Sequence, residues 1–294
     1  MSTLTVLRTG PGSSIQDLGR PGFSDVGLGA AGAADRGAAA LANRMVGNPP
    51  EAAVLEALLA SVTLRADAHV VASVTGAPCP AEIVRADGRV RGAAPYEVLT
   101  LAPGDELRLG MPDTGLRSYI AVRGGFAVEP VLGSRSWDSL AGLGPAPLAA
   151  GDVLPVGEDA DGWPVVDAVP PPPLPDPGAP VVLDAVAGPR DDWFTRDWRA
   201  ALTDQVHHVT QDSDRVGVRT TADRPLVRAI THELPSEGVE TGSLQVPPDG
   251  HPVLFLADHP VTGGYPVVAV LTPAAVDRAA QLRPGEAFRF RLTG

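Results

Sequence analysis

Short apolar runs, many of them rich in valine, alternate with turn residues along the chain. Clear examples are Val70–Val74, Val181–Val186, Val253–Leu256 and Val267–Leu271. Gly, Pro or Asp stands close to each run, as is usual for buried strands. Glycine and proline together supply 64 residues (33 plus 31), and both weaken helices. The pattern predicts a mainly β protein built of barrels or sandwiches.

One turn-and-strand pattern recurs. Pro103–Leu109 and Pro284–Phe290 each begin with Pro-Gly and an acidic residue, then alternate apolar and polar positions. This is turn chemistry leading into a half-buried strand. Gly151–Leu154 is a weaker third copy. The recurrence fits both common ancestry of two halves and the chance reuse of a common turn.

A proline-rich stretch offers the best domain boundary. Residues 169–180 contain four consecutive prolines, Pro170–Pro173, which favour extended polyproline geometry over sheet pairing. We therefore predict an N-terminal subdomain over 1–168, a linker over 169–180 and a C-terminal subdomain over 181–294. The alternative is a long loop within a single domain.

Three helices are predicted. The first begins after Asp35, which can cap it, and ends near Gly47. The second covers Asp192–Thr203. The third follows Thr272, a cap residue, with Pro273 in its first turn.

Charge and composition exclude several classes of protein. The formal net charge is −12, which argues against nucleic acid or an anionic membrane as the main partner. All 23 basic residues are arginine, so a lysine-dependent phosphate loop and Schiff-base chemistry are excluded. The single cysteine, Cys79, allows no internal disulfide, which fits the cytoplasm. We see no signal peptide and no apolar stretch of the roughly 18 to 20 residues that a membrane span needs.

The first segment with candidate chemistry is rich in glycine and runs from Gln16 to Asp35. Asp17 and Arg20 lie three positions apart in it. Arg20 could donate its forked hydrogen bonds to an anion or an amide. The alternative is a structural pair of Asp17 and Arg20 that stiffens the loop.

The second segment is Gln211–Arg219. Asp212 and Asp214 could face one way on a strand and bind Mg²⁺ through oxygen, and Arg215 follows them directly. Solvated turn residues are the alternative. The histidines lack the spacing of metal ligands, and zinc is disfavoured without cysteine pairs, so we predict no metal site built by this chain alone.

The third segment combines Ser236–Pro247 with Asp258–Pro266. Its polar and glycine residues make it a candidate pocket: Glu237, Gln245, Thr262, Gly263, Gly264 and Tyr265. The two glycines allow a ligand to approach the backbone closely. Tyr265 could stack on a planar substrate. The alternative is a tight hairpin with a packed tyrosine.

The order of these segments resembles one family over essentially the whole chain. The matching stretches are Ile15–Arg20, Gly32–Asp35, Asn43–Asn48, Leu132–Ser136, Ser213–Gly217, Ser236–Val239, Gly242–Pro247 and Thr262–Pro266. The sequence is similar to the family formed by the C subunits of 5-oxoprolinase, also called KipA or allophanate hydrolase subunit 2.

The resemblance implies two tandem cyclophilin-like β-barrel subdomains with a few short helices. It also implies an ATP-dependent enzyme that converts 5-oxo-L-proline, ATP and water into L-glutamate, ADP and phosphate. The chain would act only in complex with a KipI-like B subunit and an A subunit. ATP and Mg²⁺ would be bound by this chain or mainly by the partner, and no biotin is expected on this chain.

Roles for the site residues are assigned from their chemistry at the positions that the resemblance supports. Arg20 and Arg215 would bind the substrate carboxylate or phosphate, and Asp17, Asp214 and Glu237 would orient these arginines or hold a metal. The candidate pocket would bind the small amide substrate. The family pattern Gln-Thr before Thr262 is Pro260-Val261 here, the lysine that follows Tyr-Pro is Val267, and the usual Ser-Gly-Ala-Met-Asp is Ala31–Asp35.

Two other functions compete with this one. The same domain is similar to part of the carboxyltransferase region of urea carboxylase, so a subunit related to urea carboxylase or allophanate hydrolase is one alternative. A regulatory binding partner of a KipI-like protein is the other. A pure binding module would more often show a large exposed apolar patch.

Overall fold

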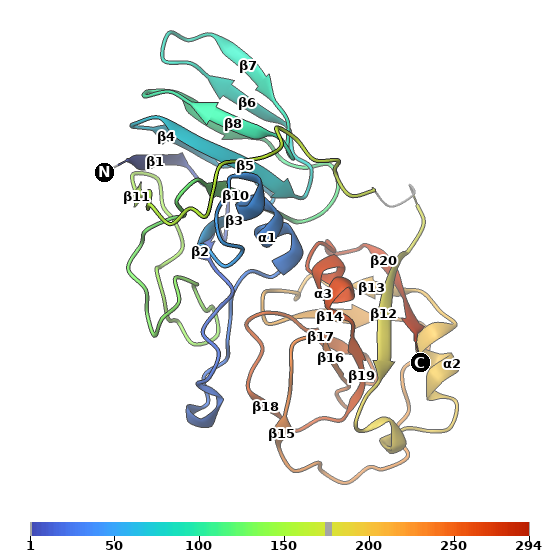
Figure 1. Ribbon diagram of the computed structural model, residues 1–294. Helices are drawn as coiled ribbons and strands as arrows, with labels where there is room; N and C mark the ends of the chain where they lie inside the picture. Colours follow the sequence, from blue (N-terminus) through green and yellow to red (C-terminus); the bar gives the residue numbers. More distant parts are fainter. Residues whose placement is uncertain (1, 174–177, 294) are drawn as a thin grey trace. The chain divides into compact units, whose positions relative to one another are not determined.

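Strands dominate the chain, as the short apolar runs predict. The computed structural model describes residues 2–173 and 178–293, so residues 174–177 of the predicted linker lie outside the described residues. The described chain contains 20 β-strands and three α-helices (Figure 1). The prediction of a mainly β protein is confirmed, and the four apolar runs named above form all or most of strands β5, β12, β17 and β19.

Two compact units share the chain. The first contains Met1–Arg20, Asp35–Asp138 and Gly142–Pro172, and the second contains Pro21–Ala34, Ser139–Ala141 and Pro173–Gly294. The chain thus passes from one unit to the other within the proline run. Two segments that come earlier in the sequence, Pro21–Ala34 and Ser139–Ala141, also belong to the second unit. No hydrophobic pattern in the sequence predicts this.

The first unit consists of two antiparallel sheets with strand orders β11-β1-β4-β9-β6-β7 and β2-β3-β10-β5-β8. Apolar side chains from both sheets form a single buried cluster, for example Val6 from one and Ile120 from the other. The strands are β1 (Thr3–Arg8), β2 (Ser14–Gln16), β3 (Val54–Leu58), β4 (Thr63–Ala66), β5 (Val70–Gly76), β6 (Ala81–Val84), β7 (Val90–Ala93), β8 (Val98–Leu101), β9 (Glu106–Leu109), β10 (Arg117–Val122) and β11 (Val153–Pro155).

The single α-helix of the first unit, among its described residues, is α1 (Arg36–Met45). Its cap is the predicted one, because the Asp35 carboxylate accepts a hydrogen bond of 2.8 Å from the backbone N–H of Ala38. Two buried hydroxyls of β5 fix the helix on the sheet. Ser73 donates to the carbonyl of Ala42 and Thr75 to that of Ala38, both at 2.7 Å.

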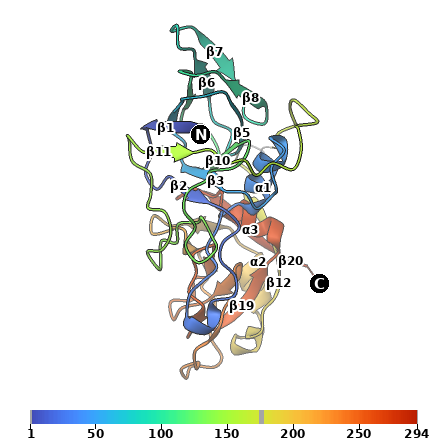
Figure 2. The same cartoon turned by 60° about the vertical axis from the view of Figure 1, so that its left-hand side comes forward.

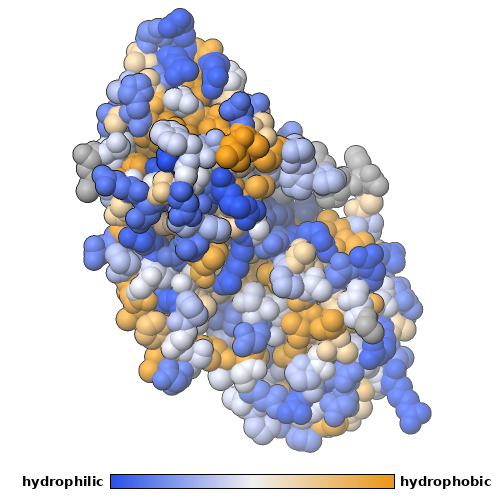
Figure 3. Space-filling model, in the orientation of Figure 1, coloured by the Kyte–Doolittle hydropathy of each residue, from blue (hydrophilic) through white to orange (hydrophobic). Residues whose placement is uncertain are grey.

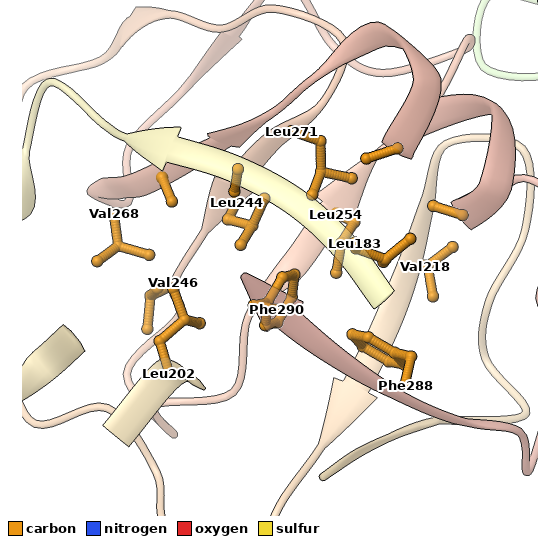
Figure 4. Packing of buried hydrophobic residues seen from close by; sticks show 14 of the residues in the cluster. Leu183, Leu202, Val218, Leu244, Val246, Leu254, Val268, Leu271, Phe288 and Phe290 are labelled. Carbon is orange, nitrogen blue, oxygen red and sulfur yellow. The ribbon is translucent and has the colours of Figure 1, made fainter. Parts of the chain in front are cut away.

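The second unit is a closed barrel of seven strands in the order β12-β19-β16-β17-β14-β13-β20. Its interior is filled by apolar side chains such as Leu183, Leu244 and Phe288, which point toward one another in Figure 4. The strands are β12 (Val181–Ala187), β13 (His207–Val209), β14 (Gly217–Thr221), β16 (Ser243–Gln245), β17 (Val253–Phe255), β19 (Val267–Leu271) and β20 (Ala287–Leu292).

Shorter elements surround the barrel. A two-stranded ribbon of β15 (Glu237–Gly238) and β18 (Thr262–Gly263) lies at the opposite end of the barrel from α3 (Pro273–Ala279) (Figure 1). Helix α3 packs beside the barrel strand β12 (Figure 2). The predicted cap of α3 is confirmed, since the Thr272 hydroxyl accepts from the backbone N–H of Ala275 at 3.3 Å. A 3₁₀ turn, η1 (Ser24–Val26), lies in the first excursion of the chain into this unit.

The predicted helix over Asp192–Thr203 is wrong as a single element. The chain instead forms a 3₁₀ turn, η2 (Asp191–Trp193), and a separate α2 (Trp198–Thr203). Phe194 between them is extended, with φ −109° and ψ 161°, and it forms a β-bridge with Arg228. This pairing with a residue distant in sequence outweighs the local helical pattern.

The recurring Pro-Gly-acid segments are the turns that the sequence predicts. Gly104 and Gly285 have φ of +85° and +87°, and they lead into β9 and β20. A side chain with a Cβ is disfavoured in this left-handed region, which is why glycine recurs there.

The face of the molecule in Figure 3 is largely hydrophilic, with hydrophobic residues in small groups. Some large apolar side chains are exposed, including Trp163 (75%) and Val165 (95%). The Arg123 guanidinium lies 4.2 Å from the centre of the Trp163 ring. Within the described residues, no helix combines the length and the apolar character that a membrane span requires.

Candidate functional site

Asp17 is fully engaged inside the first unit. Its carboxylate accepts hydrogen bonds from the hydroxyls of Ser134 and Ser136, at 2.6 and 2.5 Å. It also accepts from the backbone N–H groups of Gly19 and Arg135, at 2.7 and 2.6 Å. The carboxylate therefore fastens the loop 132–136, and no described contact pairs it directly with Arg20.

Arg20 is buried, with a relative exposure of 2%. Its guanidinium donates to the backbone carbonyls of Ser136 and Val131, and Nη1 lies 3.8 Å from an oxygen of Asp138. Nη1 has no hydrogen-bond acceptor among the described residues. This placement does not support the predicted contact between Arg20 and a substrate anion, because the side chain has no access to solvent.

Arg215 is held in a similar way in the second unit. It forms a two-pronged ion pair with Asp258, at 2.9 and 3.2 Å, and donates to the carbonyl of Gly32 at 2.6 Å. Asp258 is also the acceptor for the backbone N–H and the hydroxyl of Ser139, at 2.9 and 2.6 Å. Arg215 and Asp258 thus bind the segments Pro21–Ala34 and Ser139–Ala141 to the rest of the second unit.

Asp214 organises a turn. Its Oδ1 accepts from the backbone N–H groups of Val216 and Gly217, at 2.8 and 3.0 Å, just before β14. In the part of the chain that the structure describes, no group of three or more His, Cys, Asp or Glu side chains is placed to hold a metal ion. The residues around Asp214 do not make a preformed Mg²⁺ cage.

The remaining predicted residues come together at one end of the barrel. Glu237 and Gly263 face each other in the β15–β18 ribbon. The amide of Gln245, at the end of β16, donates to the backbone carbonyl of Tyr265 at 3.2 Å. Thr262, Gly264 and Tyr265 are exposed, Tyr265 by 43%. We call these residues, with Arg190 and Arg228 described below, the barrel-end cluster.

Gly263 packs closely against the Gln245 side chain in this cluster. A Cβ at this position would overlap the side-chain nitrogen of Gln245. The neighbouring Gly264 is different, because a Cβ there would meet a single atom within 4 Å, the Leu234 carbonyl oxygen at the ordinary contact distance of 3.7 Å. Any side chain at position 263 would therefore displace the Gln245 amide from its present position.

Two arginines that the sequence did not single out complete the cluster. Arg190 forms a two-pronged ion pair with Glu237, with an Nε to Oε2 distance of 2.9 Å. The hydrogen bonds from Arg190 lower the pKa of the Glu237 carboxyl, and the same pair raises the pKa of Arg190. The Arg228 guanidinium lies 5.5 Å from the centre of the Tyr265 ring. Cation and aromatic ring attract each other at this distance.

A cavity of about 500 Å³ lies elsewhere, in the first unit. Four of its lining residues are acidic, Glu51, Glu158, Asp159 and Asp161, and Arg135 is the one basic residue among them. None of the residues predicted from the sequence to bind substrate lines it. Its charge does not favour an anionic ligand.

Comparison with known proteins identifies the family. A family model described as the carboxyltransferase domain, subdomains A and B, matches residues 26–292. The chain belongs to this carboxyltransferase-domain family. It is 32% identical over 295 residues to the C subunit of the 5-oxoprolinase of Escherichia coli strain K12, covering 98% of this chain and 90% of that protein. The resemblance predicted from the sequence is thereby confirmed.

Solved structures of other proteins share the fold of this chain. The crystal structure of TTHA0988 superposes with a TM-score of 0.84 at 33% identity, covering 99% of this chain and 56% of the other. The urea amidolyase of K. lactis superposes with a TM-score of 0.91 at 26% identity, covering 99% of this chain and 19% of the other. The chain therefore spans about half or less of the length of these solved chains.

Several family-like motifs prove to be structural in this carboxyltransferase-domain chain. In the segment Asn43–Asn48, the Asn48 amide donates to the Val122 carbonyl at 2.7 Å, and its oxygen accepts from Gly124 N–H at 2.8 Å. The Asn43 amide donates to the carbonyls of Pro50 and Ala52. Arg190 and Arg228 lie outside every matching motif, and an isolated arginine carries no signal in the sequence that could have identified them.

Proposed function

We propose that this chain is the C-type component of an ATP-dependent 5-oxoprolinase. The observation that carries the proposal is the nearly full-length similarity, at 32% identity, to a protein named as the C subunit of 5-oxoprolinase. The reaction converts 5-oxo-L-proline, ATP and water into L-glutamate, ADP and phosphate. The chain would act with B and A subunits.

We place the lactam at the barrel-end cluster, since its side chains remain available to a ligand. With its Nε2 used on the Tyr265 carbonyl, Gln245 keeps its Oε1, to which no residue in the described chain donates. This oxygen can accept the hydrogen bond of a lactam N–H. The exposed ring of Tyr265 offers an apolar face for the flat five-membered ring.

The chemical task is to open a stable amide. Transfer of the γ-phosphoryl group from ATP to the lactam oxygen releases ADP and makes the carbonyl carbon more open to attack by water. One water then adds to this carbon and the ring nitrogen leaves as a protonated amine, which gives an acyl phosphate. A second water hydrolyses the acyl phosphate to L-glutamate and phosphate. The residues of this chain would orient the lactam so that its oxygen faces the nucleotide, because positioning contributes a large share of catalysis in phosphoryl transfer.

The described residues do not by themselves form a nucleotide site of familiar type. The chain has no lysine for a phosphate loop, and Asp17, Arg20, Asp214 and Arg215 are engaged with protein groups. We therefore assign ATP and Mg²⁺ mainly to the partner subunits.

A function related to urea carboxylase is the second candidate. It is favoured by the TM-score of 0.91 with the K. lactis urea amidolyase over 99% of this chain. Urea and 5-oxoproline both present a carbonyl flanked by N–H, so the same Gln245 contact would serve either. They differ in the carboxylate, which urea lacks.

The deciding experiment is ATP turnover by the assembled B–C complex with and without 5-oxo-L-proline, followed by addition of the A subunit and assay of L-glutamate. We expect lactam-dependent turnover and glutamate. Urea-dependent turnover without a response to 5-oxo-L-proline would favour the second candidate. An intact complex that responds to neither amide would contradict both.

A further inference from the structure

Arg228 is a partly buried cation without an anionic partner. Its side chain has no carboxylate within 4.0 Å in the described chain, unlike Arg190 and Arg215, whose carboxylate partners lie at hydrogen-bond distance. Burial lowers the pKa of its guanidinium, and Tyr265 and Asp249 offset this only partly. A charge removed from water is costly unless another group compensates it.

The protein nevertheless holds this guanidinium in one place. Nη2 donates to the carbonyl of Val246 at 2.5 Å, and the backbone of Arg228 forms a β-bridge with Phe194. The next residue, Ala229, donates its N–H to the Trp193 carbonyl at 2.9 Å. Since both its backbone and its side chain are anchored, Arg228 is preorganised, although its partly buried charge is compensated only in part.

The free hydrogen-bonding capacity of Arg228 lies on a defined edge. Nε is shielded from solvent and has no acceptor in the described chain. Nη1 also has no described acceptor, yet it is not among the shielded atoms. The Tyr265 ring lies beside the guanidinium, and the Tyr265 carbonyl accepts from the Gln245 amide. The unused Nη1 thus belongs to a guanidinium that lies near the Tyr265 ring, and Tyr265 is itself held by the Gln245 amide.

We propose that Arg228 and Tyr265 form a carboxylate-binding subsite for a small, flat ligand. Arg228 donates to the carboxylate through its free edge, and Tyr265 covers the flat part of the ligand. The identification of this ligand as 5-oxo-L-proline rests on the proposed function, whereas the subsite itself rests on the geometry of Arg228.

The first test compares the acid with uncharged relatives in the assembled A–B–C complex. The probes are 5-oxo-L-proline, its neutral carboxamide and 2-pyrrolidone, which lacks the carboxylate. Charge-assisted hydrogen bonds lead us to expect a KM for the acid lower by about tenfold or more than that for the carboxamide. Arg228→Gln should abolish this preference, and Arg228→Lys should keep part of it.

The matched control is Arg289→Gln. The Arg289 side chain is exposed on β20 and has no hydrogen-bond or ion-pair partner among the described residues, and its substitution removes the same charge. It should leave the preference for the acid unchanged. A preference that survives in Arg228→Gln, or that disappears equally in Arg289→Gln, would overturn the subsite.

A second test separates the subsite from the proposed function. Calorimetric titration of the full-length chain and of its B–C complex with 5-oxo-L-proline and the carboxamide needs no turnover. Tighter binding of the acid that depends on Arg228, in a complex without lactam turnover, would support the subsite and contradict the proposed function. Lactam turnover without an Arg228-dependent preference for the acid would support the proposed function and contradict the subsite. Absence of any preference for the acid in both tests would overturn the subsite.

Discussion

Two sets of arginines in this chain occur beside glycine-rich segments, yet they have opposite surroundings. Arg20 and Arg215 donate to protein carbonyls and carboxylates, and their side chains are 0% and 12% exposed. Arg190 and Arg228 lie at the barrel end beside exposed residues of the β15–β18 ribbon. The first set fastens loops. In the second set Arg190 pairs with Glu237 near the surface, while Arg228 keeps an unused donor and lies near the exposed Tyr265 ring.

The difference shows that a dense group of charged and glycine residues in the sequence can be either a binding site or a set of structural contacts. A loop that crosses a protein needs its backbone carbonyls satisfied, and a buried arginine does this as well as it binds an anion. What separates the two uses is whether an unused donor remains open to solvent. The unused Nη1 of Arg20 is shielded from solvent, whereas Nη1 of Arg228 is not among the shielded atoms.

The largest effect we expect is the loss of stability in Asp258→Ala. This substitution removes a buried carboxylate that accepts hydrogen bonds from both Arg215 and Ser139. Breaking a buried pair in this way costs about 3–5 kcal/mol of unfolding free energy. Urea unfolding followed by the fluorescence of the buried Trp193 and Trp198 would measure it.

Asp212→Ala is the control for this loss, because Asp212 is exposed and has no described partner. Its unfolding free energy should stay within about 0.5 kcal/mol of that of the original chain. If Asp258→Ala proved equally mild, Arg215 would not be a structural tether, and its predicted role in binding an anion would become attractive again.

The second effect concerns two adjacent glycines. In Gly263→Ala the new Cβ displaces the Gln245 amide, so we expect kcat/KM for 5-oxo-L-proline to fall by about tenfold, equivalent to about 1.4 kcal/mol. Gly264→Ala adds the same methyl group where it meets one backbone oxygen at 3.7 Å, and should be nearly neutral. Equal effects of the two substitutions would remove Gln245 from the proposed lactam site.

The third effect contrasts two neighbouring histidines on β13. His207 is buried and stacks on Phe288, with ring centroids 5.5 Å apart, while His208 is exposed. Burial lowers the pKa of His207 below its usual 6.5. The unfolded chain therefore takes up a proton more readily than the folded one. Stability from this group is complete above about pH 6.5 and is lost as the pH falls toward the lower folded pKa.

The measurement is urea unfolding at about pH 7.5 and pH 5.5 for the original chain, His207→Gln and His208→Gln. Because the His207 contribution disappears in His207→Gln, the acid-induced loss of unfolding free energy should be smaller in this variant than in the original chain. His208→Gln should retain the full loss. An unchanged pH dependence in His207→Gln would show that other groups control acid sensitivity.

Helix caps and tight turns were predicted from the sequence, because each depends on interactions between a few adjacent residues. The caps at Asp35 and Thr272 and the Pro-Gly turns at Gly104 and Gly285 each depend on a few adjacent residues, and each occurs as predicted. The family, too, followed from the order of short motifs. The alternation of apolar residues was sufficient for the class of fold, because buried strands impose it directly.

Features that depend on contacts between distant residues were not predictable. The bridge between Phe194 and Arg228 divides a predicted helix, and Asp258 binds Ser139 across 119 positions of sequence. For the same reason the predicted site was only partly useful. Glu237, Gln245 and Tyr265 do gather, but their arginine neighbours lie at positions 190 and 228, outside any motif.

The smallest effect we expect is in Glu237→Gln, and it makes the comparison between the two sets of arginines sharper. The side chains of Arg190 and Glu237 are 37% and 32% exposed, so water and salt screen their attraction. The lowered pKa of Glu237 keeps this carboxylate ionised throughout the neutral range, so the ion pair is present there.

We expect the midpoint of urea unfolding to be unchanged by Glu237→Gln, by Arg190→Gln and by both together, at low and at high salt. A strong, salt-independent coupling between the two substitutions would place this pair with the buried tethers of Arg20 and Arg215. Arg228 would then be the one arginine of the barrel-end cluster that is not committed to holding the protein together.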